Sequence, residues 1–199
     1  MSVPARILLM QTKRRQSPSF IRTGKCIERE VQQLERIYRL ARELCPDGFP
    51  AEETRELPAL YAHVPLGAVD GLRDEISDKL DLPREIFSRD RFSIHGCGPV
   101  GLHDDFFRFP YVYFVLVVAH CGRLGLIDEH SRAVQHPVGE IILLDPRRKH
   151  GLVAAGCMAE EHPYDRTHGP VHDEALQFLF LDFDVRRPDL RARFRVDAG

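Results

Sequence analysis

The chain has 199 residues, 43% of them hydrophobic, which is enough for one domain with a substantial core. Lysines and arginines number 28 against 30 aspartates and glutamates, so the formal net charge is -2. This balance argues against a nucleic-acid partner, and no apolar run is long enough to cross a membrane. Five cysteines without a Cys-x-x-Cys pair indicate reduced thiols, so we expect a cytoplasmic location.

The first part of the chain predicts one strand and two helices. Residues 6–11 form a candidate strand. Apolar residues recur at three- and four-residue steps over 27–44, which predicts an amphipathic helix that ends at the Pro46-Asp47-Gly48 turn. A second, shorter helix is predicted within 67–80. We interpret residues 1–90 as a flank of the core rather than a second domain.

From residue 91 onward the sequence predicts short strands separated by glycine and proline turns. No helical pattern alternates with them, as a parallel sheet would require. We therefore predict a single domain over 1–199, mainly β with flanking helices, whose core is an antiparallel sandwich or barrel over 91–185. The tail over 186–199 is predicted to contain a short helix. The strand candidates are 92–95, 111–119, 124–127, 140–144, 151–155 and 175–185.

Three residues in this second part have the pattern of a metal site. His103 and Asp105 are two positions apart after a glycine-rich turn, and positions i and i+2 of a strand point to the same face. His150 follows the strand candidate 140–144 and a turn. Two imidazoles and one carboxylate on one face of an octahedral metal are typical of non-haem Fe(II) oxygenases. We therefore predict His103, Asp105 and His150 as metal ligands and catalytic residues.

These motifs, in this order, resemble the 2-oxoglutarate and Fe(II)-dependent dioxygenases, particularly the prolyl-4-hydroxylase-like branch. In that branch a strand and a glycine turn lead to His-x-Asp, as in 92–105, and an apolar strand precedes a glycine-containing strand, as in 112–128. A segment with a proline and a glycine then leads into a hydrophobic strand and the second histidine, as in 137–153, where Pro137 and Gly139 are separated by one residue. The resemblance implies a double-stranded β-helix, a jelly-roll or cupin-like barrel, with Fe(II), 2-oxoglutarate as co-substrate, and dioxygen.

The resemblance also implies a basic residue on a strand after the second histidine, which binds the far carboxylate of 2-oxoglutarate. The last strand candidate contains no basic residue over 174–182. Arg166, from a loop, and Arg123, from the strand after the Cys121-Gly122 turn, are the candidates for this role. Tyr111 and Tyr113 are candidates for additional hydrogen bonds from their phenol groups.

The predicted function is hydroxylation of a small molecule, amino acid or peptide side chain, with release of succinate and CO2. Desaturation and ring formation are alternative outcomes of the same chemistry. The alternative from another class is a cupin-like metal-binding isomerase or a non-catalytic binding barrel, although the His-x-His cluster usual in cupins is missing. The sequence leaves the substrate and the oligomeric state open.

The remaining polar residues of interest have simpler interpretations. The other histidines, His95 and His136 among them, are expected to be structural or solvent-facing. The basic run 147–149 is interpreted as a solvated turn or as a contact for an anionic substrate group. Cys97 and Cys121 are expected to be buried and to have unactivated thiols. If the three predicted ligands bind no metal, they are ordinary turn residues.

Overall fold

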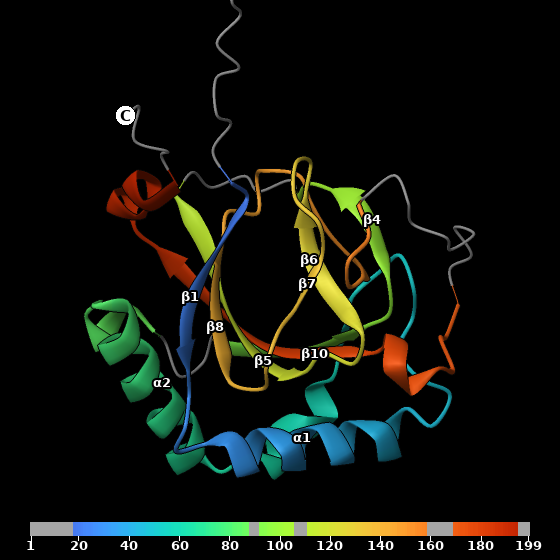
Figure 1. Cartoon of the computed structure of the whole chain (residues 1–199). Helices are drawn as coiled ribbons and strands as arrows, with labels where there is room; N and C mark the ends of the chain where they lie inside the picture. Colours follow the sequence, from blue (N-terminus) through green and yellow to red (C-terminus); the bar gives the residue numbers. More distant parts are fainter. Residues whose placement is uncertain (1–17, 88–91, 106–110, 159–168, 195–199) are drawn as a thin grey trace, which may run out of the picture.

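Two antiparallel β-sheets face each other, and two helices lie beside them (Figure 1). The computed structural model describes residues 18–87, 92–105, 111–158 and 169–194. The strand predicted at 6–11 lies outside this part of the chain. No helix within it is both long and apolar enough to span a membrane.

The larger sheet has six strands in the order β1-β8-β5-β10-β3-β2. All of its ladders are antiparallel, as the sequence predicts. Two of its strands come from the first 90 residues, so the predicted flank contributes directly to the sheet. The strands are β1 (Phe20–Cys26), β2 (Arg55–Glu56), β3 (Phe92–Cys97), β5 (Val112–His120), β8 (Glu140–Leu144) and β10 (Phe178–Arg186).

The smaller sheet has four strands in the order β4-β9-β6-β7, again all antiparallel. Its inner face packs against the larger sheet, because one apolar cluster combines Val100, Leu126 and Leu152 of this sheet with Leu116 and Phe178 of the other. This inter-sheet space contains the candidate site. The strands are β4 (Val100–His103), β6 (Leu124–Asp128), β7 (Val134–Gln135) and β9 (His150–Ala154).

The helices cover the outer face of the six-stranded sheet. Helix α1 (Val31–Leu44) buries Leu34, Ile37 and Ala41 in a cluster that also contains alternate residues of β5 and β10. Helix α2 (Leu66–Leu80) adds Leu72 and Ile76 to that cluster. The remaining described helices are single 3-10 segments, η1 (Pro58–His63), η2 (Arg84–Ile86), η4 (Glu174–Leu176) and η5 (Pro188–Phe194).

Two predicted helix positions can be compared with the structure. The helix predicted over 27–44 begins only at Val31, because the Ile27 N–H is bonded to the Gly139 carbonyl at 2.7 Å and so continues the β1 pairing. The short helix predicted in the tail is η5, which buries Leu190 and Phe194. Burial of these two residues, which the sequence spaces four apart, holds the tail against the sheet.

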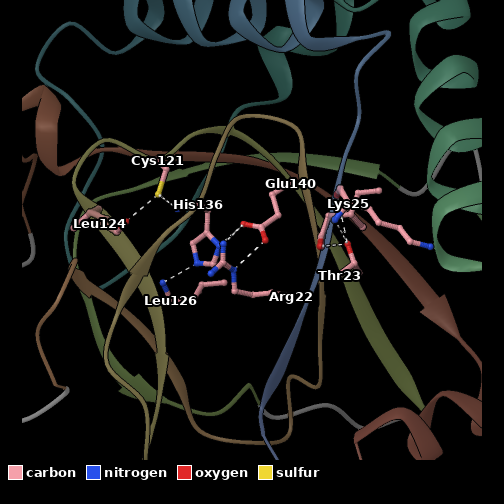
Figure 2. Close-up of polar contacts among 9 residues, drawn as sticks. Arg22, Thr23, Lys25, Cys121, Leu124, Leu126, His136 and Glu140 are labelled. Carbon is pink, nitrogen blue, oxygen red and sulfur yellow. Dashed lines mark hydrogen bonds and ion pairs between the residues drawn. The ribbon is translucent and has the colours of Figure 1, made fainter.

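A cluster of hydrogen bonds around the buried Glu140 joins the two sheets near the start of β8. Glu140, only 2% exposed, accepts hydrogen bonds from Arg22 Nε at 2.9 Å and from His136 Nδ1 at 2.8 Å (Figure 2). The backbone N–H of Leu126 donates to His136 Nε2 at 3.2 Å, which assigns the ring proton to Nδ1. Burial alone would raise the pKa of Glu140, but these two hydrogen-bond partners outweigh it and lower the pKa.

Candidate metal centre

The three predicted ligands converge at one end of the inter-sheet space. His103 ends β4, His150 begins β9, and the two are direct partners in the β4–β9 ladder. Asp105 follows β4 by two residues. One donor atom from each of the three side chains lies within 4.8 Å of the other two. The structure therefore brings Asp105 and His150 together, although they are 45 positions apart in the sequence.

The separations of the donor atoms fit one metal ion. Nε2 of His103 lies 3.8 Å from Asp105 Oδ1, and Nε2 of His150 lies 3.5 Å from Asp105 Oδ2. Adjacent ligands at about 2.1 Å from an octahedral ion stand about 3 Å apart, so a small contraction would close the triad around the ion. His150 is nearly buried at 7% exposure, whereas His103 is 40% exposed and leaves the centre open on one side.

Both imidazoles are held with the same nitrogen directed to the centre. His103 Nδ1 donates to the Gly101 carbonyl at 2.9 Å, and His150 Nδ1 donates to the Arg148 carbonyl at 2.8 Å. Each ring therefore keeps its proton on Nδ1 and presents the Nε2 lone pair to the ion, as metal-bound histidines usually do. The Asp105 N–H donates to the Pro146 carbonyl at 2.8 Å, which fixes the third ligand beside the turn that precedes His150.

A cavity of about 470 Å³ adjoins the three ligands. Its walls are mainly apolar side chains from both sheets, and most are contributed by alternate strand positions. Among the described lining residues there is no lysine or arginine. Besides the three ligands, the lining residues are Thr54, His95, Cys97, Val100, Asp104, Phe114, Leu116, Leu126, Leu144, Gly151, Leu152, Phe178, Phe180 and Asp182.

The structure does not place the predicted co-substrate contacts in this cavity. Tyr113 is fully buried on the opposite face of β5, in the cluster beneath the helices, where it stacks on Phe194 at 5.4 Å. Arg123 is 70% exposed and pairs with Asp173 at 3.2 Å. Tyr111 is 40% exposed, precedes β5, and is not a lining residue. Arg166 lies outside the described residues.

The prediction that Tyr113 contacts the co-substrate was wrong because both faces of β5 are buried. Val112–His120 is apolar at nearly every position, so the sequence carries no polar and apolar alternation that would distinguish the two faces. The pairing of β5 with β10 determines which face of β5 lines the cavity. It directs Phe114 and Leu116 into the cavity and Tyr113 away from it. Phe114 and Leu116 are thus cavity residues that the sequence did not identify.

The basic residues 147–149 before His150 form ion pairs and do not line the cavity. Arg147 and Arg148 both contact Asp145, at 2.8 and 3.3 Å, and Lys149 contacts Glu129 at 3.2 Å. Arg147 also lies over the ring of Tyr113, with its guanidinium carbon 4.8 Å from the ring centroid. These contacts agree with the interpretation of the run as a turn.

Two polar residues of the cavity were not identified as site residues from the sequence. His95 on β3 was expected to be structural, and Asp182 on β10 carried no expectation. Burial raises the pKa of Asp182 well above its usual value, and the nearby carboxylates Asp184 and Asp105 raise it further. Burial lowers the pKa of His95. The signal in the sequence was a carboxylate, Asp182, within a mainly apolar strand.

No family model and no curated protein matches the sequence. Several solved structures are similar to it at low identity. AviO1 from Streptomyces viridochromogenes Tue57 is 10% identical, with 87% of this chain and 91% of that chain covered and a TM-score of 0.46. A Pseudomonas putida prolyl-4-hydroxylase is 13% identical, with 85% and 94% covered and a TM-score of 0.44. HygX from Streptomyces hygroscopicus, with nickel and 2-oxoglutarate bound, is 12% identical, with 86% and 84% covered and a TM-score of 0.42.

The similarities concern the arrangement of the backbone. The function proposed below is drawn from the residues of this chain.

Proposed function

We propose that the chain is a non-haem Fe(II) and 2-oxoglutarate-dependent dioxygenase that hydroxylates a small molecule, an amino acid or a peptide side chain. The observation that carries this proposal is the convergence of His103, Asp105 and His150, with both Nε2 atoms free to bind a metal. The strand orders of the two sheets support assignment of the core as a double-stranded β-helix.

The chemistry that Fe(II) supplies when bound is oxidation of a substrate C–H bond with 2-oxoglutarate and dioxygen, with release of succinate and CO2. The chain's own contribution is structural and electrostatic. His103, Asp105 and His150 would hold one side of the ion and leave the other side to exchangeable ligands. Apolar walls that include Leu126, Leu152 and Phe178 disfavour water next to the ion, which would limit side reactions of a reactive centre.

One observation favours the second candidate, a metal-binding barrel that does not use 2-oxoglutarate. The strand after the second histidine is β10, and its cavity residues are Phe178, Phe180 and Asp182, none of them basic. The far carboxylate of 2-oxoglutarate would therefore need a cation from elsewhere, and Arg166 is the candidate that the sequence offers. A cupin-like isomerase or a binding barrel would have no such requirement.

The test is to purify the protein without oxygen, add Fe(II) and then 2-oxoglutarate, and follow the weak visible charge-transfer band of the iron chelate. Asp105→Ala and His150→Ala should both lose the band. Asp104→Ala is the matched control, because it removes a neighbouring exposed carboxylate that is not among the three converging side chains. Succinate release should then follow the same order among the variants.

Each result separates the candidates. A band in the wild-type protein and in Asp104→Ala, but in neither ligand variant, supports the dioxygenase. Iron binding without a band supports the metal-binding barrel. Absence of iron binding would contradict both and return the three residues to the role of turn residues.

A further inference from the structure

Two residues that line the cavity from the wall opposite the metal ligands each have a buried polar atom. Oδ1 of Asp182 and Nδ1 of His95 are both buried and have no hydrogen-bond partner among the described residues. Both side chains line the cavity from the six-stranded sheet, whereas His103 and His150 line it from the four-stranded sheet. A buried polar atom without a partner is costly, so a ligand that offers a hydrogen bond to these side chains would be stabilised by it.

The two residues are neighbours on one face of the sheet. In the β10–β3 ladder Asp182 is opposite Ser93, and Phe180 is opposite His95. Asp182 and His95 are therefore diagonal neighbours, a relation that places strand residues about 7–8 Å apart. The His95 ring is held by stacking on Phe180, with ring centroids 5.4 Å apart. One ligand can therefore contact both side chains from the cavity.

The residues around Asp182 and His95 indicate which charge the ligand group should carry. Asp104, Asp105 and Asp182 line the cavity, and an adjoining hollow that shares His103 and Asp105 adds Glu52 and Glu53. No lysine or arginine is among the described residues that line either space. These carboxylates attract a cationic group to this part of the cavity, and low-dielectric walls strengthen the attraction.

The other residues that line the cavity indicate the polarity of the rest of the ligand. Phe114, Phe178 and Phe180 surround the polar pair with aromatic rings, and leucines from both sheets complete the cavity. Such walls favour an apolar skeleton. Burial favours the uncharged form of Asp182, so the charged form needs a hydrogen-bond donor that itself carries a positive charge. A protonated amine offers several N–H donors on one atom, so it can bond to Asp182 and reach the imidazole as well.

We propose that Asp182 and His95 form a substrate subsite for a protonated amine on an apolar skeleton, held across the cavity from His103, Asp105 and His150. This assignment deepens the proposed function by naming a class of substrate, and oxidation of such an amine would rest on that function. Binding of the amine does not depend on it, because neither residue belongs to the metal triad. The subsite is therefore testable by binding alone.

The experiment compares three probes of similar size by calorimetry, with and without Mn(II) in the protein. They are 2-phenylethylamine, 2-phenylethanol and 3-phenylpropanoate, which are cationic, neutral and anionic at pH 7. We expect the amine to bind about tenfold or more tightly than the alcohol, because a hydrogen bond to a charged group is worth roughly that factor. With Mn(II) bound, the aromatic protons of the amine should relax faster, which places the amine beside the metal.

Asp182→Asn should weaken amine binding about tenfold or more and change alcohol binding by less than about twofold. The matched control is Asp184→Asn, on the same strand but not a lining residue, which should change amine binding by less than about threefold. Circular dichroism and Mn(II) binding report whether each variant is folded. If Asp182→Asn does not fold, the order of the three probes in the wild-type protein still tests the charge of the subsite.

Tightest binding of the anion, or amine binding unchanged in a folded Asp182→Asn variant, would overturn the proposal. Selective amine binding that needs Asp182 in a protein that binds no metal would support the subsite while contradicting the dioxygenase. Failure of the subsite and failure of the proposed function are thus distinguishable.

Discussion

His103 and His150 face each other directly across the β4–β9 ladder, with ring centroids 4.5 Å apart and an interplanar angle of 55°. Each ring donates its Nδ1 proton to the carbonyl oxygen two residues earlier in the chain. The same local contact thus orients both histidines. The pairing of the two strands then brings their free nitrogens together, so the metal centre is a product of strand register.

The first prediction concerns metal binding by this pair. His103→Ala should weaken Co(II) binding by about 100-fold or more, because even loss of an outer hydrogen-bond partner costs about 10–100-fold. A saturating metal should then raise the melting temperature of the wild-type protein and leave that of the variant unchanged, since only a ligand that binds the folded state stabilises it. His130→Ala, at an exposed loop position, is the control and should retain the full shift.

Removal of the buried carboxylate at the start of β8 should lower stability and its pH dependence. Glu140→Gln should cost about 1–3 kcal/mol in the free energy of unfolding at pH 7, because charge-assisted hydrogen bonds from Arg22 and His136 are lost. Urea unfolding measures this cost. The exposed Glu43→Gln on α1 should change it by less than about 0.5 kcal/mol.

The same residue predicts the direction of the pH effect. The pKa of Glu140 is lower in the folded protein than in the unfolded chain. Its contribution to stability is therefore complete above the unfolded pKa of about 4.3 and is lost as the pH falls through the folded pKa. The free energy of unfolding should fall less steeply in Glu140→Gln than in the wild-type protein below about pH 4.3. Equal slopes would show that the ion pair does not govern acid stability.

Gly125 should tolerate no side chain. A Cβ atom at this position of β6 would lie 2.5 Å from the Val134 carbonyl oxygen and 2.7 Å from the Val134 nitrogen, both backbone atoms of β7. We expect Gly125→Ala to lower the free energy of unfolding by about 1–3 kcal/mol, as overpacking typically does. Gly67→Ala in α2 is the matched control, because nothing lies within 4 Å of its Cβ. Thermal unfolding should show a loss only in the first variant.

The five cysteines should divide into two classes by reactivity. Burial raises the pKa of Cys97 to about 12 and that of Cys121 to about 11, so at pH 8 both are almost entirely uncharged thiols. Iodoacetamide should modify the partly exposed Cys26 and Cys157 of the folded protein well before these two, as read by peptide mass spectrometry. Rapid labelling of Cys97, which lines the cavity, would contradict this assignment.

Much of the site could be predicted from the sequence because its signals are local. His103 and Asp105 share a face because of the two-residue period of a strand, and His150 follows an apolar strand and a turn. The metal-binding residues and their chemistry could therefore be predicted from the sequence. The strands β5, β6 and β8 were visible as β-branched or apolar runs. In contrast, β1 was missed because its residues, Phe20–Cys26, are mostly polar and partly exposed, and its pairing with β8 is its main support.

The sequence by itself determined which residues can bind a metal and that the core is antiparallel, because residue type and short-range periodicity carry that information. Only the tertiary structure decided what surrounds the metal. Both faces of β5 are buried, so composition does not say whether Tyr113 or Phe114 faces the cavity. On β10, composition does not say that Asp182 lies on the cavity face. The ladder with β3 and β5 fixes that choice, since a shift of one residue in register would exchange the two faces.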